Sequence, residues 1–247
     1  MTTEADALPT PAPVAEPEGV MSLVDHLSEL RTRIFRMIGA VGVGTVVGFL
    51  VVGRLIELLS EPLGDRTLYF TSPGEAFFIQ MKLAVVVGIV LGMPVILHQV
   101  WGFISPGLTP EERRVARPWV PVALVFFAVG VGVAYTVLPF AMSFLLGFET
   151  DSLQALITAD NYFSFVGTLF LAFGLTMEFP IVLVLLSKVG IVTSARLTAA
   201  RRYVVLGIAI FAAFVTPGGD LISPLILGVV MYLLFELSII LVRAGGR

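Results

Sequence analysis

The feature that most constrains this chain is a run of 30 residues, from Trp119 to Phe148, without a charged side chain. A helix of this length, rising ~1.5 Å per residue, can cross the ~30 Å hydrocarbon core of a bilayer. The whole chain is also strongly apolar: 57% of its residues are hydrophobic, 13% are charged, and its mean hydropathy is +0.99. Soluble domains carry roughly one-quarter charged residues. The sequence therefore predicts an integral membrane protein.

Further apolar runs, each flanked by charged or polar residues, predict an all-α, polytopic fold with six transmembrane helices. The third span is expected to end near Pro139. The last two spans are expected to be short, because the uncharged part of the fifth holds 13 residues and rises only ~20 Å. The predicted spans are residues 37–53, 76–97, 119–139, 161–187, 203–215 and 221–242.

Local signals predict how some of these helices begin and pack. Apolar residues at helical spacing after Ser22 predict a short amphipathic surface helix ahead of the first span. Residues 72–75 (Ser-Pro-Gly-Glu) predict a helix start in which serine is the cap and proline takes the first position. Two glycine pairs have the spacing that lets helix backbones approach closely. These pairs are Gly44 with Gly48 and Gly88 with Gly92.

Charge predicts the orientation of the chain in the membrane. Residues 1–20 are rich in Pro, Ala and Glu and are predicted to be a disordered tail, followed by a membrane domain over 21–243 and a short end over 244–247. Six crossings place both termini on one side, which carries 12 Lys and Arg residues against 3 on the other. Because cytoplasmic loops hold the excess of basic residues, both termini are predicted to be cytoplasmic.

Catalytic signatures are missing from the sequence. The two histidines, His26 and His98, stand in no metal-binding pattern, and no nucleophile elbow or phosphate-binding loop is present. The chain has no cysteine, which excludes disulfides and thiolate chemistry. We therefore expect no enzyme activity, no metal and no cofactor.

Two acids lie inside predicted spans. Glu178 falls about ten residues from the cytoplasmic end of the fourth span, roughly 15 Å deep, where an ionisable group is costly and is a functional candidate by default. It is equally well explained as a structural carboxyl that serves backbone groups disturbed by Pro180. Glu236 lies closer to the cytoplasmic interface, where a structural role is favoured.

Two further acids lie at the predicted cytoplasmic face, and each has a local explanation. Thr109 and Glu112 have the spacing of a capping box, in which threonine caps a helix and glutamate bonds back to it. Glu29 has Arg33 as a partner one helical turn later. His26 is expected to be an interfacial polar residue.

The order and spacing of several motifs resemble the TatC family, the multi-spanning receptor subunit of the twin-arginine protein translocase. The resemblance covers about residues 21–243. It is carried by His26-Leu27-Ser28-Glu29-Leu30-Arg31-Thr32-Arg33, Ser72-Pro73-Gly74-Glu75-Ala76-Phe77, residues 94–103 (PVILHQVWGF), Pro106-Gly107-Leu108 with Glu112-Arg113-Arg114, and Phe173-Gly174 with Glu178 and Pro180.

This resemblance implies a receptor in the cell (inner) membrane that binds the twin-arginine signal peptides of folded cargo proteins. Glu29 and Glu112 would receive the arginine pair, Arg31 would belong to the same region, and Glu178 would line a concave membrane cavity. The implied partners are single-span TatA and TatB type subunits, further copies of the chain and the lipid bilayer, with no nucleic acid. Partner contacts near Thr216 and Asp220 are implied too.

At that turn the chain departs from the family pattern, in which a double proline and Asp follow the Thr and a Gln comes soon after. Here Gly218-Gly219-Asp220 carries an extra residue, and Pro224 occupies the expected Gln position. The charges near the proposed acids also matter. Four arginines there would repel an arriving arginine pair unless their side chains point elsewhere. These are Arg31, Arg33, Arg113 and Arg114.

Two other functions stay open at this point. Glu178 and the short helices are compatible with a secondary transporter or proton-coupled channel, although hydropathy shows no inverted repeat and no paired broken helices. A scaffold that only assembles other membrane subunits is the third possibility, and in that case the cytoplasmic acids would be dispensable.

Overall fold

The computed structural model describes residues 23–188, 190–215 and 221–244. The predicted tail over residues 1–20, Ser22, and the turn with Thr216 and Asp220 lie outside these ranges. The described residues form helices joined by short connections, and two single-turn helices, η1 (Glu61–Leu63) and η2 (Ser105–Gly107), lie in the connections. The main helices are α1 (Leu23–Ser60), α2 (Glu75–Ile104), α3 (Pro110–Ala116), α4 (Trp119–Leu146), α5 (Ala159–Thr176), α6 (Phe179–Lys188), α7 (Ser194–Val215) and α8 (Ile222–Ala244).

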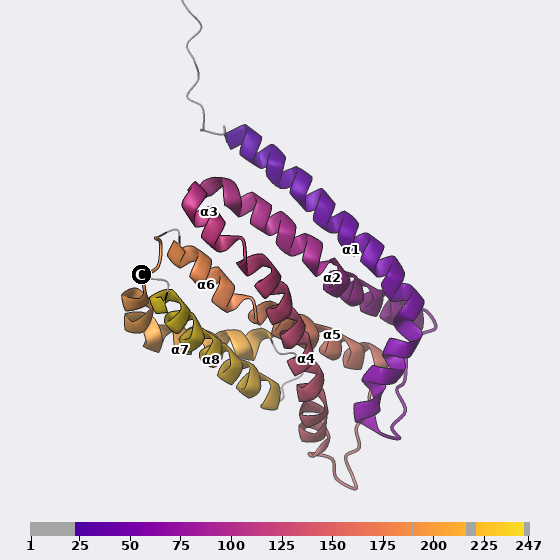
Figure 1. Cartoon of the computed structure of the whole chain (residues 1–247). Coiled ribbons are helices and arrows are strands. Elements are labelled where there is room, and N and C mark those ends of the chain that lie inside the picture. Colours follow the sequence, from indigo (N-terminus) through magenta and orange to yellow (C-terminus); the bar gives the residue numbers. More distant parts are fainter. Residues whose placement is uncertain (1–22, 189, 216–220, 245–247) are drawn as a thin grey trace, which may run out of the picture.

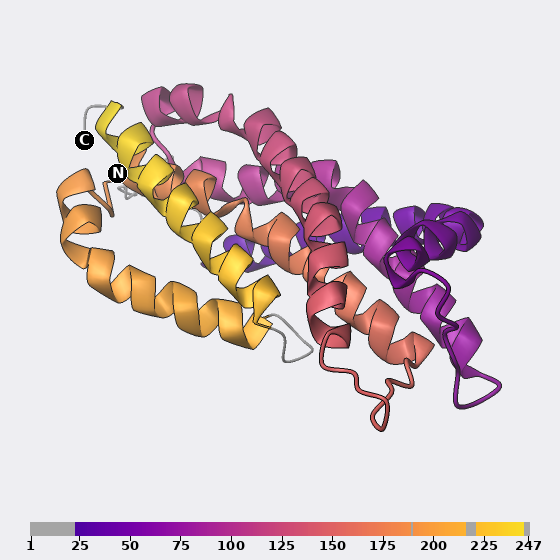
Figure 2. The same cartoon turned by 90° about the horizontal axis from the view of Figure 1, so that it is seen from below.

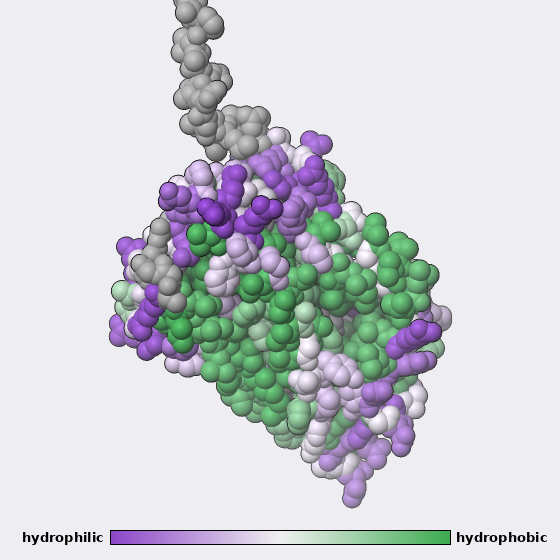
Figure 3. All heavy atoms as spheres, in the orientation of Figure 1, coloured by the Kyte–Doolittle hydropathy of each residue, from purple (hydrophilic) through white to green (hydrophobic). Residues whose placement is uncertain are grey.

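Six helical segments among the described residues are long and apolar enough to cross a membrane, as predicted. The last two, over α7 and α8, measure 22 residues each and are the shortest of the six, which confirms that prediction too. Figure 3 shows a broad apolar belt with polar residues gathered at its two ends. In Figure 1 the start of α1, α3 and the last turn of α8 lie toward one end, and the connections after α1 and α4 lie toward the other.

Several helix boundaries differ from those predicted. The surface helix and the first span are one continuous helix of 38 residues, because Arg36 and Arg54 change the polarity of the helix surface without interrupting its backbone hydrogen bonds. The fifth span likewise begins at Ser194, nine residues earlier than predicted. α4 continues through Pro139 to Leu146.

The predicted cap of the second span was wrong. α2 begins at Glu75 with Gly74 as its N-cap residue, and no side chain caps it. The Glu75 carboxylate instead turns back and accepts hydrogen bonds from the backbone N–H and the hydroxyl of Thr71, each at 2.6 Å. Residues 72–74 therefore form a turn ahead of the helix.

The fourth span is broken into α5 and α6 at Met177 and Glu178. Pro180 has no backbone N–H, so it cannot donate to the carbonyl of Thr176, and a helix is interrupted at such a point. The carbonyl of Glu178 restarts the helical ladder by accepting from the N–H groups of Ile181 and Val182, both at 3.1 Å. The break sets the Glu178 side chain between two helices.

The two glycine pairs mark the contact between α1 and α2. A Cβ atom built on Gly44 would lie 2.7 Å from the carbonyl oxygen of Gly88, and one built on Gly48 would lie 2.7 Å from that of Ala84. Helix backbones approach this closely only where the side chain is a hydrogen atom. This contact fixes the register of α1 against α2, and therefore the residues that meet at their ends.

At the end of the molecule away from α3, the connection after α1 and the connection after α4 contact each other through hydrogen bonds. The Arg66 guanidinium donates to both carboxylate oxygens of Glu149 at 2.6 Å, and the backbone N–H of Tyr69 donates to the carbonyl of Ile157 at 3.1 Å. The hydrogen bonds from Arg66 lower the pKa of Glu149 to about 2.

This ion pair predicts an acid-sensitive connection. The folded-state pKa of Glu149 lies below its ordinary value of 4.5, so the pair stabilises the contact above pH 4.5 and is lost as pH falls toward about 2. We expect spin labels on Asp65→Cys and Asp151→Cys, which are specific because the chain has no cysteine, to separate over this range. Adding Arg66→Gln should widen the label distance already at neutral pH, and an unchanged distance would contradict the prediction.

Candidate functional site

Glu29 is held at the start of α1 by an arginine on the same helix. Arg33 donates to Oε1 of Glu29 from Nε at 2.9 Å and from Nη2 at 2.5 Å, as the predicted pairing one turn apart requires. Its Nη1 also donates to the side-chain oxygen of Gln99 on α2 at 3.3 Å. Oε2 of Glu29 is buried and has no hydrogen-bond partner among the described residues. The carboxylate therefore keeps one oxygen for a further donor.

Two more contacts fix the start of α1 on the end of α2, and neither was predicted. The Arg33 guanidinium lies against Gly102, where an added Cβ would come within 2.2 Å of Nη1. The ring of His26 stacks on Phe103, with 4.5 Å between centroids and 24° between planes. His26 is thus a packing residue. The signal that could have revealed this site is Gly102, a small residue between bulky neighbours in the motif at 94–103.

Glu112 lies in the first turn of α3 and forms the predicted capping box. Its backbone N–H donates to Oγ1 of Thr109 at 3.3 Å, and its Oε2 accepts from the backbone N–H of Thr109 at 3.0 Å. The next residue, Arg113, turns back and donates to the carbonyl of Ser105 at 2.8 and 3.2 Å. The cap therefore fixes the orientation of the Glu112 carboxylate, and Arg113 fixes α3 against η2.

Both acids thus lie next to arginines that contact one short segment of the chain, residues 99–105. Arg33 connects Glu29 to Gln99, and Arg113 connects the turn of Glu112 to Ser105. Six helical residues rise about 9 Å, which sets the scale of the separation between the two anchoring points. Figure 1 places the start of α1 and α3 at the same end of the molecule.

Three of the four nearby arginines have contacts of their own. Arg33 and Arg113 are engaged as described, and the Arg31 guanidinium lies over the ring of Phe35, 5.8 Å from its centroid. Arg31 is two residues from Glu29, and residues at this spacing do not face each other on a helix. It therefore stands beside the acid without neutralising it.

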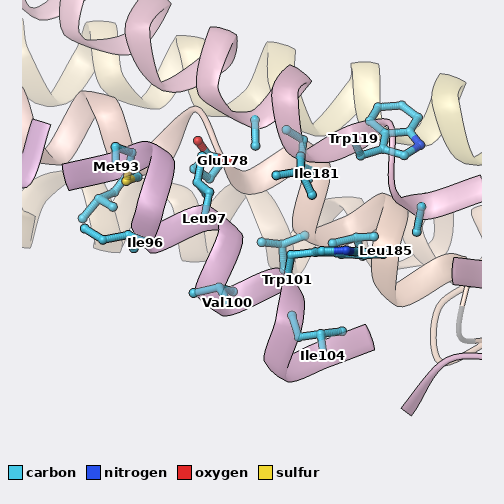
Figure 4. A pocket seen from close by; sticks show the side chains of 15 residues that line it. Met93, Ile96, Leu97, Val100, Trp101, Ile104, Trp119, Glu178, Ile181 and Leu185 are labelled. Atoms are coloured by element: carbon cyan, nitrogen blue, oxygen red, sulfur yellow. The ribbon is translucent and has the colours of Figure 1, made fainter. Parts of the chain in front are cut away.

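The two intramembrane acids differ in one contact. Oε2 of Glu236 on α8 accepts from Nη2 of Arg201 on α7 at 2.6 Å, and this contact joins the two helices, in agreement with a structural role. Oε1 of Glu236 is buried without a hydrogen-bond partner among the described residues. Oε1 of Glu178 is buried without a hydrogen-bond partner among the described residues. Glu178 lines a cavity of about 230 Å³ between α2, α4 and α6, which Figure 4 shows.

The fold and these contacts define a class of protein: a multi-pass membrane protein with two ordered acids on a polar face and an apolar body. Comparisons with known proteins give its family. The family described as "Sec-independent protein translocase protein (TatC)" matches residues 25–229. The chain belongs to the TatC family and is a component of the twin-arginine protein translocase.

Relatives match along most of their length. The chain is 42% identical to the Sec-independent protein translocase protein TatC of Synechocystis sp., over 87% of this chain and 85% of the relative. It is 36% identical to the protein of the same name from Desulforapulum autotrophicum, over 90% and 84%. A crystal structure of the twin arginine translocase receptor TatC superposes with a TM-score of 0.78 at 35% identity, covering 90% of this chain and 100% of that one.

Proposed function

We propose that this protein is the receptor that binds twin-arginine signal peptides of folded cargo, with Glu29 and Glu112 accepting the arginine pair at the cytoplasmic face. The single observation that carries this proposal is that the arginine bonded to Glu29 and the arginine next to Glu112 both contact residues 99–105, which places the two acids at the same end of the molecule. In an extended peptide, adjacent side chains point to opposite sides. Two neighbouring arginines can therefore reach two separate acids at once.

The chemistry favours arginine over lysine. A guanidinium presents a planar fork of donors that matches a carboxylate, whereas an ammonium is a compact point charge. Arg33 already binds Glu29 through two of its nitrogens, so this carboxylate accommodates a guanidinium. Two charge-assisted contacts contribute about 3–6 kcal/mol, below the roughly 8 needed for micromolar affinity. The apolar stretch of the signal must supply the remainder by lying along the helices.

The proposal also covers the membrane location of the receptor and its partner subunits. It lies in the inner membrane with both termini in the cytoplasm, acts without catalysis, and assembles with further copies of itself and with single-span TatA and TatB type subunits. A groove of about 480 Å³ along α7 and α8, lined by side chains such as Val205, Leu225 and Tyr232, supports docking of such a helix. Thr216 and Asp220, which follow α7 in the sequence and lie outside the described residues, are proposed partner contacts.

A secondary transporter is less well supported. Its best feature is Glu178 at the break between α5 and α6, but the other helices that span the apolar belt in the described residues run without such an interruption. A substrate site at the midplane is usually built from a pair of broken helices.

The proposal is tested by titrating the solubilised full chain with a twin-arginine signal peptide and with its twin-lysine variant. We expect the arginine peptide to bind about tenfold or more tightly, because lysine cannot reproduce the fork geometry. Glu112→Gln should lower the affinity for the arginine peptide by a similar factor. Glutamine still completes a capping box, so this variant removes the charge and keeps the helix start.

Glu111→Gln is the matched control, because Glu111 precedes Glu112 in the same turn and takes no part in the capping box. It should leave binding unchanged. Equal affinities for the arginine and lysine peptides, or unaltered binding by Glu112→Gln, would reject the proposed recognition.

A further inference from the structure

The cavity at Glu178 has an unusual lining. Among the fifteen described residues that line it, Glu178 is the one charged side chain, and the others are apolar or aromatic. The chain has two tryptophans, Trp101 and Trp119, and both belong to this lining. Figure 4 shows Trp119 at one end of the lining, and Glu178 near Leu97 on the side toward Met93. The cavity is therefore an apolar space with a carboxyl toward one end and indole rings toward the other.

The carboxyl of Glu178 lacks a hydrogen-bond donor at one of its oxygens. Oε1 is buried without a hydrogen-bond partner in the described part of the chain, and a buried polar atom left in this condition costs free energy, more when it is charged. Oε1 of Glu236 is unpaired in the same way among the described residues, but Oε2 of Glu236 accepts a hydrogen bond from Arg201. A ligand that brings a donor into the cavity would remove this cost at Glu178.

The rim indicates where such a ligand comes from. Leu175 is 56% exposed, Val182 is 50% exposed and Val100 is 42% exposed, and all three belong to the lining. They lie on spanning helices, where exposed apolar side chains face lipid. The cavity is therefore accessible to molecules dissolved in the bilayer.

We propose that this cavity binds a small amphiphilic ammonium compound from the membrane, with its ammonium group at Glu178 and its hydrocarbon chain directed toward the tryptophans. A volume of about 230 Å³ holds about eight groups the size of a water molecule, at ~30 Å³ each. An alkylammonium of about that many heavy atoms fits. This inference is independent of arginine recognition at Glu29 and Glu112.

Charge and donor capacity select this class. A primary ammonium has three donors and no acceptor, so it satisfies a carboxylate without adding an unsatisfied acceptor. Its hydrogen bond to a carboxylate is charge-assisted, which an alcohol cannot match. An anionic amphiphile would be repelled. The apolar walls contribute equally to any chain of the same length, so preference among headgroups depends on Glu178 alone.

The two tryptophans make the test direct. The full chain in maltoside micelles is titrated with 6-bromohexylammonium and with 6-bromohexanol, each of eight heavy atoms, whose bromine quenches tryptophan emission on contact. We expect saturable quenching by both, with half-saturation at about tenfold lower concentration for the ammonium compound. Glu178→Gln should abolish this difference, while Glu236→Gln, at an intramembrane acid outside the cavity, should retain it.

Thermal unfolding of each variant checks that the helices remain assembled. Equal half-saturation for the two compounds in the unaltered protein would reduce the site to an apolar pocket and overturn the proposal. Quenching that does not saturate, or an ammonium preference that survives Glu178→Gln, would overturn it as well. None of these outcomes bears on binding of the signal peptide.

Discussion

Replacing Gly88 with alanine is expected to push α1 away from α2 and to destabilise the protein by about 1–3 kcal/mol. The new Cβ would lie 2.4 Å from Oγ1 of Thr45 and 2.7 Å from both the Thr45 nitrogen and the Val41 carbonyl oxygen. Two of these atoms belong to the backbone, so a change of side-chain rotamer cannot relieve the overlap. Thermal unfolding in detergent should show a lower midpoint.

Gly42→Ala is the control for helix propensity. Gly42 lies on α1, and nothing lies within 4 Å of a Cβ built on it. Because alanine favours a helix over glycine by up to about 1 kcal/mol, this variant should be as stable as the unaltered protein or more stable. Gly44→Ala, which meets the backbone of Gly88 at 2.7 Å, should behave like Gly88→Ala. Equal midpoints for Gly42→Ala and Gly44→Ala would show that the helices separate without cost.

The glycine contact between α1 and α2 explains which parts of the site can be predicted from the sequence and which cannot. The pairing of Glu29 with Arg33 and the capping box at Glu112 join residues three or four positions apart, so local spacing predicts both. The contact of Arg33 with Gln99 joins residues 66 positions apart. It depends on the register of α1 against α2, which follows from atomic packing at the glycines and cannot be derived from spacing.

Helix boundaries follow a similar division. The six spans were predictable because charged residues delimit apolar runs, and a bilayer excludes charge. The sequence did not predict where α1 ends or where α7 begins. In both helices the backbone hydrogen bonding continues into segments whose side chains are polar. The sequence shows a proline, Pro180, two residues after Glu178 and so indicates where the helix is disturbed. The cavity at Glu178 is also formed by α2 and α4, whose positions the sequence does not give.

Glu29→Gln is expected to lower the affinity for a twin-arginine peptide by about 10- to 100-fold, because it removes one charge-assisted contact of about 1.5–3 kcal/mol. Glu57→Gln is the matched control, since Glu57 is an exposed acid near the other end of α1. It should bind like the unaltered protein. Peptide titration at low ionic strength measures both, because salt screens exposed charges.

Arg33→Gln separates two roles for Glu29. Arg33 occupies Oε1 of Glu29 and places a positive charge where the peptide arginine must arrive. Removing a competitor of this kind, 18% exposed and one helical turn away, should raise peptide affinity by about 2- to 5-fold. If Glu29 instead serves only to hold Arg33 against Gln99 and Gly102, Arg33→Gln should lower affinity as much as Glu29→Gln does. If Arg33→Gln raises peptide affinity while Glu29→Gln lowers it, Glu29 binds the peptide. If both variants lower peptide affinity, Glu29 serves to hold α1 against α2.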